Sequence, residues 1–174
     1  MKFILSFIAI AIVAVSVVFC GQTQNSSNDD YMRIHITANS NSQQDQDIKY
    51  LVKDAVVEFL IPVLSEAKNK EEAEILINQN LEKVEEVANS ALKTQGVTYN
   101  SSISIVYEQM PARAYDNLVL EEGVYESLNI VLGEGKGDNW WCVVFPAVCF
   151  LNSNNFQNLE YISKIWDIIN DVTN

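Results

Sequence analysis

The stretch that decides the fold is YMRIHITANSNSQQDQDIKYLVKDAVVEFL, residues 31–60. Its first part, residues 31–38, alternates β-branched and other side chains and predicts a β-strand. The polar run that follows supplies turn formers and helix caps, and Ser42 and Asp45 are both candidate N-caps. Over residues 45–60 apolar side chains recur at helical spacing, which predicts an amphipathic helix packed on the strand.

Beyond this stretch the chain predicts one more long helix and several short strands. Pro62 is expected to interrupt or end the first helix. A second helix is expected over residues 70–94, with Gly96 at its C-terminal cap. Extended segments follow at residues 97–107, 118–120 and 125–132, and residues 140–150 are expected to hold another short strand that Pro146 ends. The order predicts an α+β domain, with two main helices on one face of a small mixed or antiparallel sheet.

The chain of 174 residues has room for one ordinary domain between two terminal segments. Residues 1–20 include the uncharged run 3–19, which is either a signal peptide or a membrane anchor; both carry the rest across a membrane. Residues 21–30 are expected to form a flexible linker. Residues 31–151 are expected to form the exported domain, and residues 152–174 an Asn-rich spacer with a possible last amphipathic helix.

The charge of the exported part limits its partners. The whole chain carries a formal net charge of −12, and residues 1–20 contribute one lysine and no acid, which leaves 10 basic and 23 acidic residues, or −13. Such a surface repels nucleic acids and anionic lipid headgroups. We therefore expect no nucleic-acid partner, and membrane contact only through the N-terminal segment.

The glycine-rich run GEGKGDN, residues 133–139, has the wrong spacing for a phosphate loop. A Walker loop needs four residues before its Gly-Lys and a Ser or Thr after it, whereas Asp138 stands two places after Lys136 here. A dinucleotide fingerprint would need a helix next, but two tryptophans follow. We interpret the run as a tight loop whose glycines permit positive φ, and we expect no bound cofactor.

His35 is the only histidine of the chain. On a strand it shares a face with Arg33 and Thr37, opposite the neighbouring isoleucines. A zinc site would need more ligands than the exported part offers in His and Cys, and no G-x-S-x-G nucleophile motif is present. The sequence therefore predicts no catalytic set and no metal site; a hydrogen-bonded structural role and a place in a binding surface both remain open for His35.

Aromatic and cysteine residues follow the glycine loop. Trp140 and Trp141 should point to opposite faces of a strand, so that either or both act in the core or as anchors for a partner. Cys142 and Cys149 either form a disulfide, which an oxidising compartment favours, or are two buried thiols. The C-x-x-C spacing of redox catalysts is absent, so the expected bond is structural.

Two blocks of the chain are specific enough to indicate a family. The first matches at Arg33, His35, Ala38, Asn39, Ser40, Asp45 and Gln46. The second matches at Gly133, Gly135, Lys136, Gly137, Asn139, Trp140, Trp141, Cys142, Val143, Phe145 and Pro146. With these blocks, residues 31–151 resemble the stage II sporulation protein R family of endospore-forming bacteria.

The resemblance implies a signalling protein and not an enzyme. Such proteins are secreted across the forespore membrane into the intermembrane space, where they activate a membrane-embedded aspartic protease of the mother cell that processes the sigma-E precursor. The candidate contacts for that protease are Arg33, His35, Asn39, Ser40, Lys136, Asn139, Trp140, Trp141, Phe145 and Pro146. Two alternatives remain: an exported hydrolase with a cleft near His35 and Asn39, and a wall- or solute-binding domain that uses the tryptophans.

Overall fold

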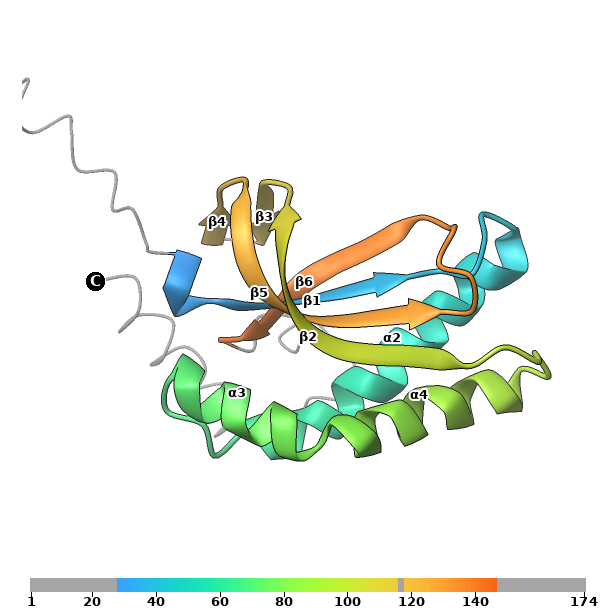
Figure 1. Ribbon diagram of the computed structural model, residues 1–174, viewed down its shortest axis with the longest axis horizontal. Coiled ribbons are helices and arrows are strands. Elements are labelled where there is room, and N and C mark those ends of the chain that lie inside the picture. Colours follow the sequence, from blue (N-terminus) through green and yellow to red (C-terminus); the bar gives the residue numbers. More distant parts are fainter. Residues whose placement is uncertain (1–27, 116–117, 147–174) are drawn as a thin grey trace, which may run out of the picture.

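The computed structural model describes residues 28–115 and 118–146, and Figure 1 shows helices packed against a sheet. The elements in chain order are η1 (Asn28–Asp30), β1 (Met32–Thr37), α2 (Gln43–Leu64), α3 (Lys70–Gln79), α4 (Leu81–Thr94), β2 (Ser101–Met110), β3 (Arg113–Tyr115), β4 (Leu118–Leu120), β5 (Gly123–Leu132) and β6 (Asn139–Phe145). This arrangement confirms the predicted α+β class. The first described residues, Asn28–Asp30, form a short 3-10 turn that contacts β5.

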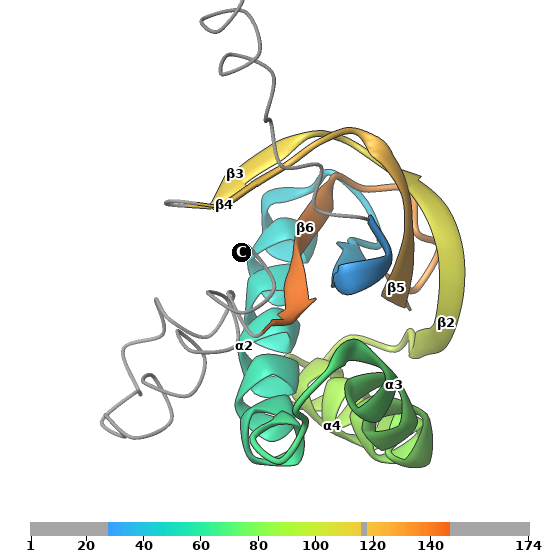
Figure 2. The same ribbon diagram turned by 90° about the vertical axis from the view of Figure 1, so that its left-hand side faces the viewer.

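The sheet is mixed, and its strand order is β2-β5-β1-β6. The first strand, β1, lies in the interior, parallel to β5 and antiparallel to β6, while β2 closes the other side antiparallel to β5. Figure 2 shows all three helices on one side of this sheet. Neighbouring side chains on β1 therefore separate into a helix-facing row and a row on the opposite face.

The core forms between the helices and one face of the sheet. Ile34 and Ile36 of β1 are at most 1% exposed and belong to the same apolar cluster as Val52 and Val56 of α2. Burying each such side chain contributes about 1.5–3 kcal/mol, so the predicted helical stripe of α2 is a main source of stability. Within the described residues no helix is both long and apolar enough to cross a membrane.

The boundaries of α2 differ in one respect from the prediction. Of the two candidate N-caps, Ser42 holds the position, since its side chain accepts a hydrogen bond from the Asp45 amide at 3.1 Å. The prediction that Pro62 interrupts or ends the helix is wrong, because α2 continues through Pro62 to Leu64. Pro62 lies in the last turn, where its missing N–H removes only one helical hydrogen bond. Ser65 then closes the helix by donating its hydroxyl to the Pro62 carbonyl at 2.8 Å.

The single helix predicted over residues 70–94 is two helices, α3 and α4, separated at Asn80. Asn80 has φ −113° and ψ 8°, and its side-chain amide donates to the Leu76 carbonyl at 2.8 Å. This local bond competes with the backbone ladder and changes the helix direction. Both helices bury apolar side chains, among them Ala73 and Ile77 of α3 and Val84 of α4. Gly96 follows α4 with a positive φ of 72°, which suits the predicted position at the end of the helix.

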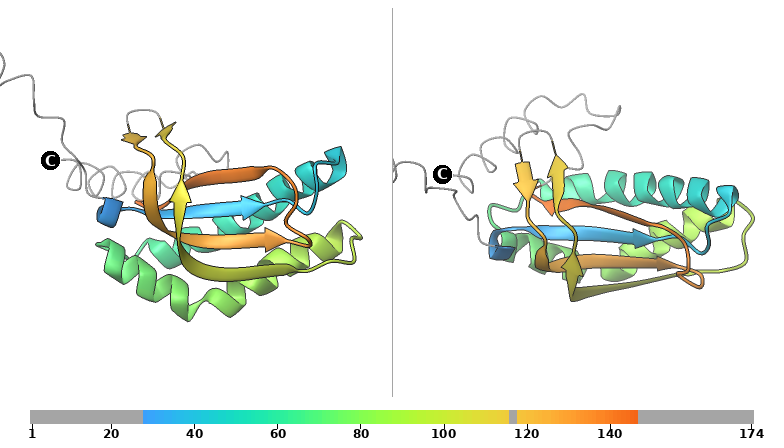
Figure 3. Two further views of the ribbon diagram at one scale, coloured as in Figure 1. Left: turned by 45° about the horizontal axis from the view of Figure 1, so that its top comes forward. Right: turned by 90° about the horizontal axis from the view of Figure 1, so that it is seen from above.

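A two-stranded arm, β3 paired with β4, folds over the sheet on the side away from the helices, as Figures 2 and 3 show. The expected extended segments at residues 118–120 and 125–132 are confirmed as β4 and β5, and β6 ends before Pro146 as predicted. The expectations for the leader, most of the linker, the spacer and the last helix concern residues 1–27 and 147–174, which lie outside the described residues.

Candidate functional site

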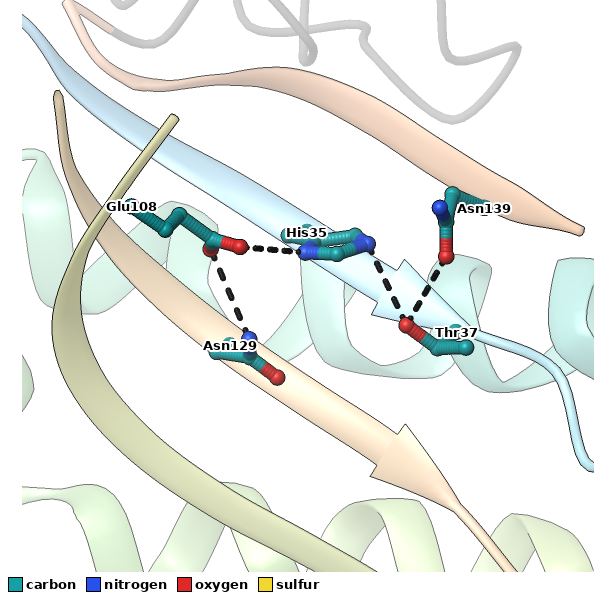
Figure 4. A network of polar contacts seen from close by, with 5 residues as sticks. All are labelled: His35, Thr37, Glu108, Asn129 and Asn139. Atoms are coloured by element: carbon teal, nitrogen blue, oxygen red, sulfur yellow. Dashed lines mark hydrogen bonds and ion pairs between the residues drawn. The ribbon is translucent and has the colours of Figure 1, made fainter. Parts of the chain in front are cut away.

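A row of polar side chains occupies the sheet face that the helices leave open, and Figure 4 shows how they converge. The register places His35 of β1 beside Asn129 of β5, and Thr37 beside Asn139 of β6. Glu108 reaches the same row from β2. Each of the four strands of the main sheet thus contributes a side chain, and we call these five residues the polar row.

Hydrogen bonds connect the polar row from one edge of the sheet to the other. His35 Nδ1 lies 2.9 Å from Glu108 Oε2, and His35 Nε2 lies 3.2 Å from Thr37 Oγ1. Thr37 donates its hydroxyl proton to Asn139 Oδ1 at 3.0 Å, and Asn129 lies at the outer limit of hydrogen bonding to Glu108, at 3.5 Å. The His35 and Glu108 side chains are 12% and 22% exposed, so a partner can reach them.

The Glu108 carboxylate, the His35 imidazole and the Thr37 hydroxyl lie in a row. This is the order of the orienting acid, the base and the nucleophile in a catalytic triad. In this arrangement, however, Thr37 donates its hydroxyl proton to Asn139 Oδ1, while the donor and acceptor roles of the two imidazole nitrogens depend on the tautomer. The histidine thus connects Glu108 of β2 to Thr37 of β1 across the open face of the sheet. Thr37 is also only 9% exposed, which limits access to its hydroxyl.

The two adjacent tryptophans point to opposite faces of β6, as predicted, and both are half-buried. Trp141 stacks on His35, with ring centroids 5.5 Å apart, and the Arg113 guanidinium lies 5.0 Å from its centroid. Trp140 lies on the helix side, where Lys53 Nζ is 5.8 Å from its centroid. Each indole therefore already has a cationic neighbour, and Trp141 extends the polar row.

Three of the candidate contact residues are buried in the structure. Arg33 is fully buried, donates to the Pro111 carbonyl at 3.1 Å and the Tyr115 hydroxyl at 3.0 Å, and so holds the β3–β4 arm onto the sheet. Phe145 and Pro146 are also buried, at the end of β6. We assign these three residues to the fold; the remaining candidates are half-buried or exposed.

The glycine loop between β5 and β6 is tight, as the sequence indicates. Gly133 and Gly135 have φ of 57° and 59°, in the region that favours glycine. Gly137 is needed for a different reason: a Cβ there would collide with the Ser40 carbonyl. The loop therefore packs directly against the Asn39–Asn41 turn that follows β1.

Several hydrogen bonds fasten the glycine loop to that turn. The Asn39 side-chain oxygen accepts from the Glu134 amide at 2.9 Å, and the Asn39 backbone carbonyl accepts from the Lys136 amide at 3.1 Å. The Ala38 carbonyl accepts from the Gly137 amide at 2.9 Å, and the Asn41 side chain accepts from the Asp138 amide at 2.6 Å. The Asn39 side chain is therefore hydrogen-bonded within the fold, while the Lys136 side chain remains exposed.

Asp45 holds the turn in place from α2. Its carboxylate accepts from Ser40 Oγ at 2.5 Å, the Tyr99 hydroxyl at 2.6 Å and Asn39 Nδ2 at 2.9 Å. These bonds, above all those from Ser40 and Tyr99, lower the pKa of Asp45 to about 2. Burial and the neighbouring Asp45 carboxylate raise the pKa of Tyr99 in turn. The sequence indicated Asp45 only as a helix cap, because Tyr99 lies far away along the chain.

The predicted disulfide joins one described residue to one that is not described. Cys142 is buried in β6, 6% exposed, and Cys149 lies outside the described residues, so the pairing stays a prediction. We expect non-reducing mass spectrometry of the oxidised chain to find a peptide pair linked through Cys142 and Cys149, two hydrogens lighter than the reduced form. Two alkylatable thiols in that preparation would contradict the bond.

Comparisons with known proteins agree with the specific blocks of the sequence. The family model described as stage II sporulation protein R matches residues 28–155. The stage II sporulation protein R of Bacillus subtilis (strain 168) is 37% identical over 134 residues, which cover 76% of this chain and 59% of the relative. The chain therefore matches about three fifths of that relative's length. No solved structure matches the chain.

Proposed function

The chain belongs to the stage II sporulation protein R family, and from this premise we propose that it is an exported signalling protein of sporulation. It is secreted across the forespore membrane into the intermembrane space. There it activates a membrane-embedded aspartic protease, which processes the sigma-E precursor in the mother cell. Residues 1–20 direct the export, either as a cleaved signal peptide or as an anchor formed by residues 3–19.

The observation that carries this proposal is the extent of the family match. The family match covers residues 28–155, which include the whole described domain and both specific blocks. The similarity therefore extends over this entire fold and is not limited to a short motif, which supports a shared role. The strongly acidic composition, with a net charge of −12, is compatible with a protein partner and unfavourable for nucleic acids.

The mechanism we propose is activation by association. A ligand shifts a partner between two states only by its difference in affinity for them, which favours a rigid contact surface. The polar row is cross-linked over four strands, and the glycine loop is bonded to the turn after β1. The proposed contact surface combines the polar row and Trp141 with the exposed Lys136 side chain.

Reconstitution in vegetative cells tests the proposal. Co-expression of the full chain, the membrane protease and the sigma precursor should give precursor cleavage, and deletion of residues 3–19 should abolish it by preventing export. We expect Lys136→Glu combined with Asn139→Arg to reduce cleavage about tenfold, equivalent to ~1.4 kcal/mol of lost binding. Glu58→Arg, a charge reversal on an exposed residue of α2, is the matched control and should leave cleavage unchanged. Absence of cleavage despite verified export would overturn the proposal.

One observation favours an exported hydrolase as the second candidate, namely the in-line order of Glu108, His35 and Thr37. In that case the purified chain alone should cleave a wall or peptide substrate. His35→Gln should abolish the cleavage while the far-ultraviolet circular dichroism spectrum stays that of the folded chain. A wall- or solute-binding role is less well supported, because the Trp141 ring is already contacted by His35 and Arg113.

A further inference from the structure

The sheet has two edge strands, β6 and β2. On β6, Cys142 and Val143 have further interaction partners. On the other side of the sheet, β2 pairs with β5 over ten residues, from Ser101 to Met110. Among residues 28–115 and 118–146, β5 is the strand partner of β2.

The register identifies which backbone groups of β2 point outward. The Gly133 amide donates to the Asn100 carbonyl at 2.9 Å, so Asn100 faces β5, whereas the Ser101 amide turns away and donates to the Asn89 side chain at 2.7 Å. The direction of the backbone amide and carbonyl groups alternates from one residue to the next along a strand. The groups of Ile103, Ile105, Tyr107 and Gln109 therefore point outward, as those of Ser101 do. Within the described part of the chain, these four positions have no hydrogen-bonding partner for their amides.

The β2 strand lacks the basic residues, the proline and the bulge that commonly protect an edge strand. The strand SSISIVYEQM contains no lysine, arginine or proline, and its register with β5 runs without a bulge. On the helix-facing side Ile103 and Ile105 are half-buried and Tyr107 is 70% exposed. The apolar layer therefore continues to the edge, where an added strand would cover it.

An acidic cleft begins where β2 begins. It has a volume of about 700 Å³ and lies between α4 and the segment at residues 97–100 that leads into the strand. Glu82, Glu85 and Glu86 line it, with Lys93 as the one basic residue. Asn89, which accepts the outward Ser101 amide, also lines the cleft, so the cleft and the open edge are continuous.

We propose that the outer edge of β2 binds an extended, basic segment of the partner protein as an added strand, with its basic side chains over the glutamates of α4. The backbone groups would supply the affinity, and the acidic cleft would select the charge. The inference deepens the proposed function and rests on it in one respect, since the segment would belong to the activated protease.

A proline scan of the edge tests the inference in the reconstituted cells. Tyr107→Pro removes an outward amide and leaves the ladder to β5 intact, which proline tolerates on an edge strand. We expect it to lower precursor cleavage about tenfold, while Tyr107→Thr, which keeps the amide, stays within about twofold of wild type. Equal cleavage by Tyr107→Pro and wild type, at equal amounts of exported protein, would overturn the inference and leave the proposed function standing.

A binding measurement on the full chain in mild detergent does not depend on activation. The probes are two octapeptides, one alternating lysine with valine and the other alternating glutamate with valine. The lysine peptide should slow hydrogen exchange of the four outward amides about tenfold, and Glu82→Gln with Glu85→Gln and Glu86→Gln should remove that protection. Unchanged exchange with the lysine peptide, or equal protection by the glutamate peptide, would overturn the inference. Failure of wild-type activation alone would instead contradict the proposed function.

Discussion

Replacing Asp45 by asparagine is expected to lower the free energy of unfolding by about 3 kcal/mol, because it breaks a charged hub that several donors share. Ser40, Tyr99 and Asn39 all donate to this carboxylate, which is 8% exposed. An asparagine side chain has one acceptor oxygen, and its NH2 group would face one of these donors without being able to accept from it. At least one buried donor is then left without an acceptor.

Urea unfolding measures this loss, and Asp47→Asn is the matched control. Asp47 lies on the same helix and bonds only to the exposed Gln43 side chain, at 2.7 Å, so its replacement should cost less than about 0.5 kcal/mol. Equal midpoints for the two variants would show that the hub does not contribute the expected stability.

The Asp45 hub also makes stability depend on pH in the acid range. The folded-state pKa is about 2 against an ordinary value of 3.8, so the contribution is present above pH 4 and is lost as the pH falls toward 2. Linkage gives about 2 kcal/mol for a shift of this size. The Asp45→Asn variant should therefore lack this acid-dependent part of the unfolding curve, and the difference from wild type should shrink at low pH.

The local elements of the fold could be predicted because their signals lie within short windows. Alternation identified β1, helical spacing identified α2, and glycine chemistry explained the φ values of Gly133 and Gly135. The errors were at Pro62 and Asn80, where propensity is weak evidence. A proline in a last helical turn costs little, and an asparagine side chain can end one helix and begin the next.

The polar row shows what the sequence could not reveal. His35 and Asn139 were candidates, but Glu108 was not, since its meeting with His35 depends on how β2, β5 and β1 align across the sheet. The Asp45–Tyr99 bond has the same non-local origin. Burial likewise separated Arg33 from the surface candidates. The segment 118–120 was predicted, but the sequence did not indicate β3 or that the β3–β4 arm folds over Arg33.

The Lys70–Glu126 ion pair carries the second large prediction. Lys70 Nζ lies 2.7 Å from Glu126 Oε2, and the side chains are 16% and 2% exposed. Lys70 stands in the first turn of α3, where the helix dipole disfavours a cation, so this pair must offset that cost. Burial alone would lower the pKa of Lys70, but the close Glu126 carboxylate outweighs it and raises the pKa.

Lys70→Met is expected to lower the free energy of unfolding by about 3–5 kcal/mol near neutral pH, because it leaves a buried carboxylate without its counter-charge. Lys70→Met combined with Glu126→Gln should recover most of the loss. Lys83→Met, which breaks an exposed pair with Glu86 at 2.9 Å, is the control and should cost less than about 0.5 kcal/mol.

The pH dependence of the Lys70→Met variant distinguishes lost charge compensation from lost packing. Burial, followed by the charge of Glu126, already raises the pKa of the neighbouring Glu74. A group with a raised folded-state pKa stabilises the fold below its ordinary pKa and loses that contribution as the pH rises. Protonation of Glu74 should relieve its repulsion from the Glu126 carboxylate, so the destabilisation measured by urea unfolding should be smaller near pH 4 than near pH 7. If the loss of unfolding free energy were the same at both pH values, Lys70 would stabilise the fold through packing and not through its charge, because packing contacts do not titrate.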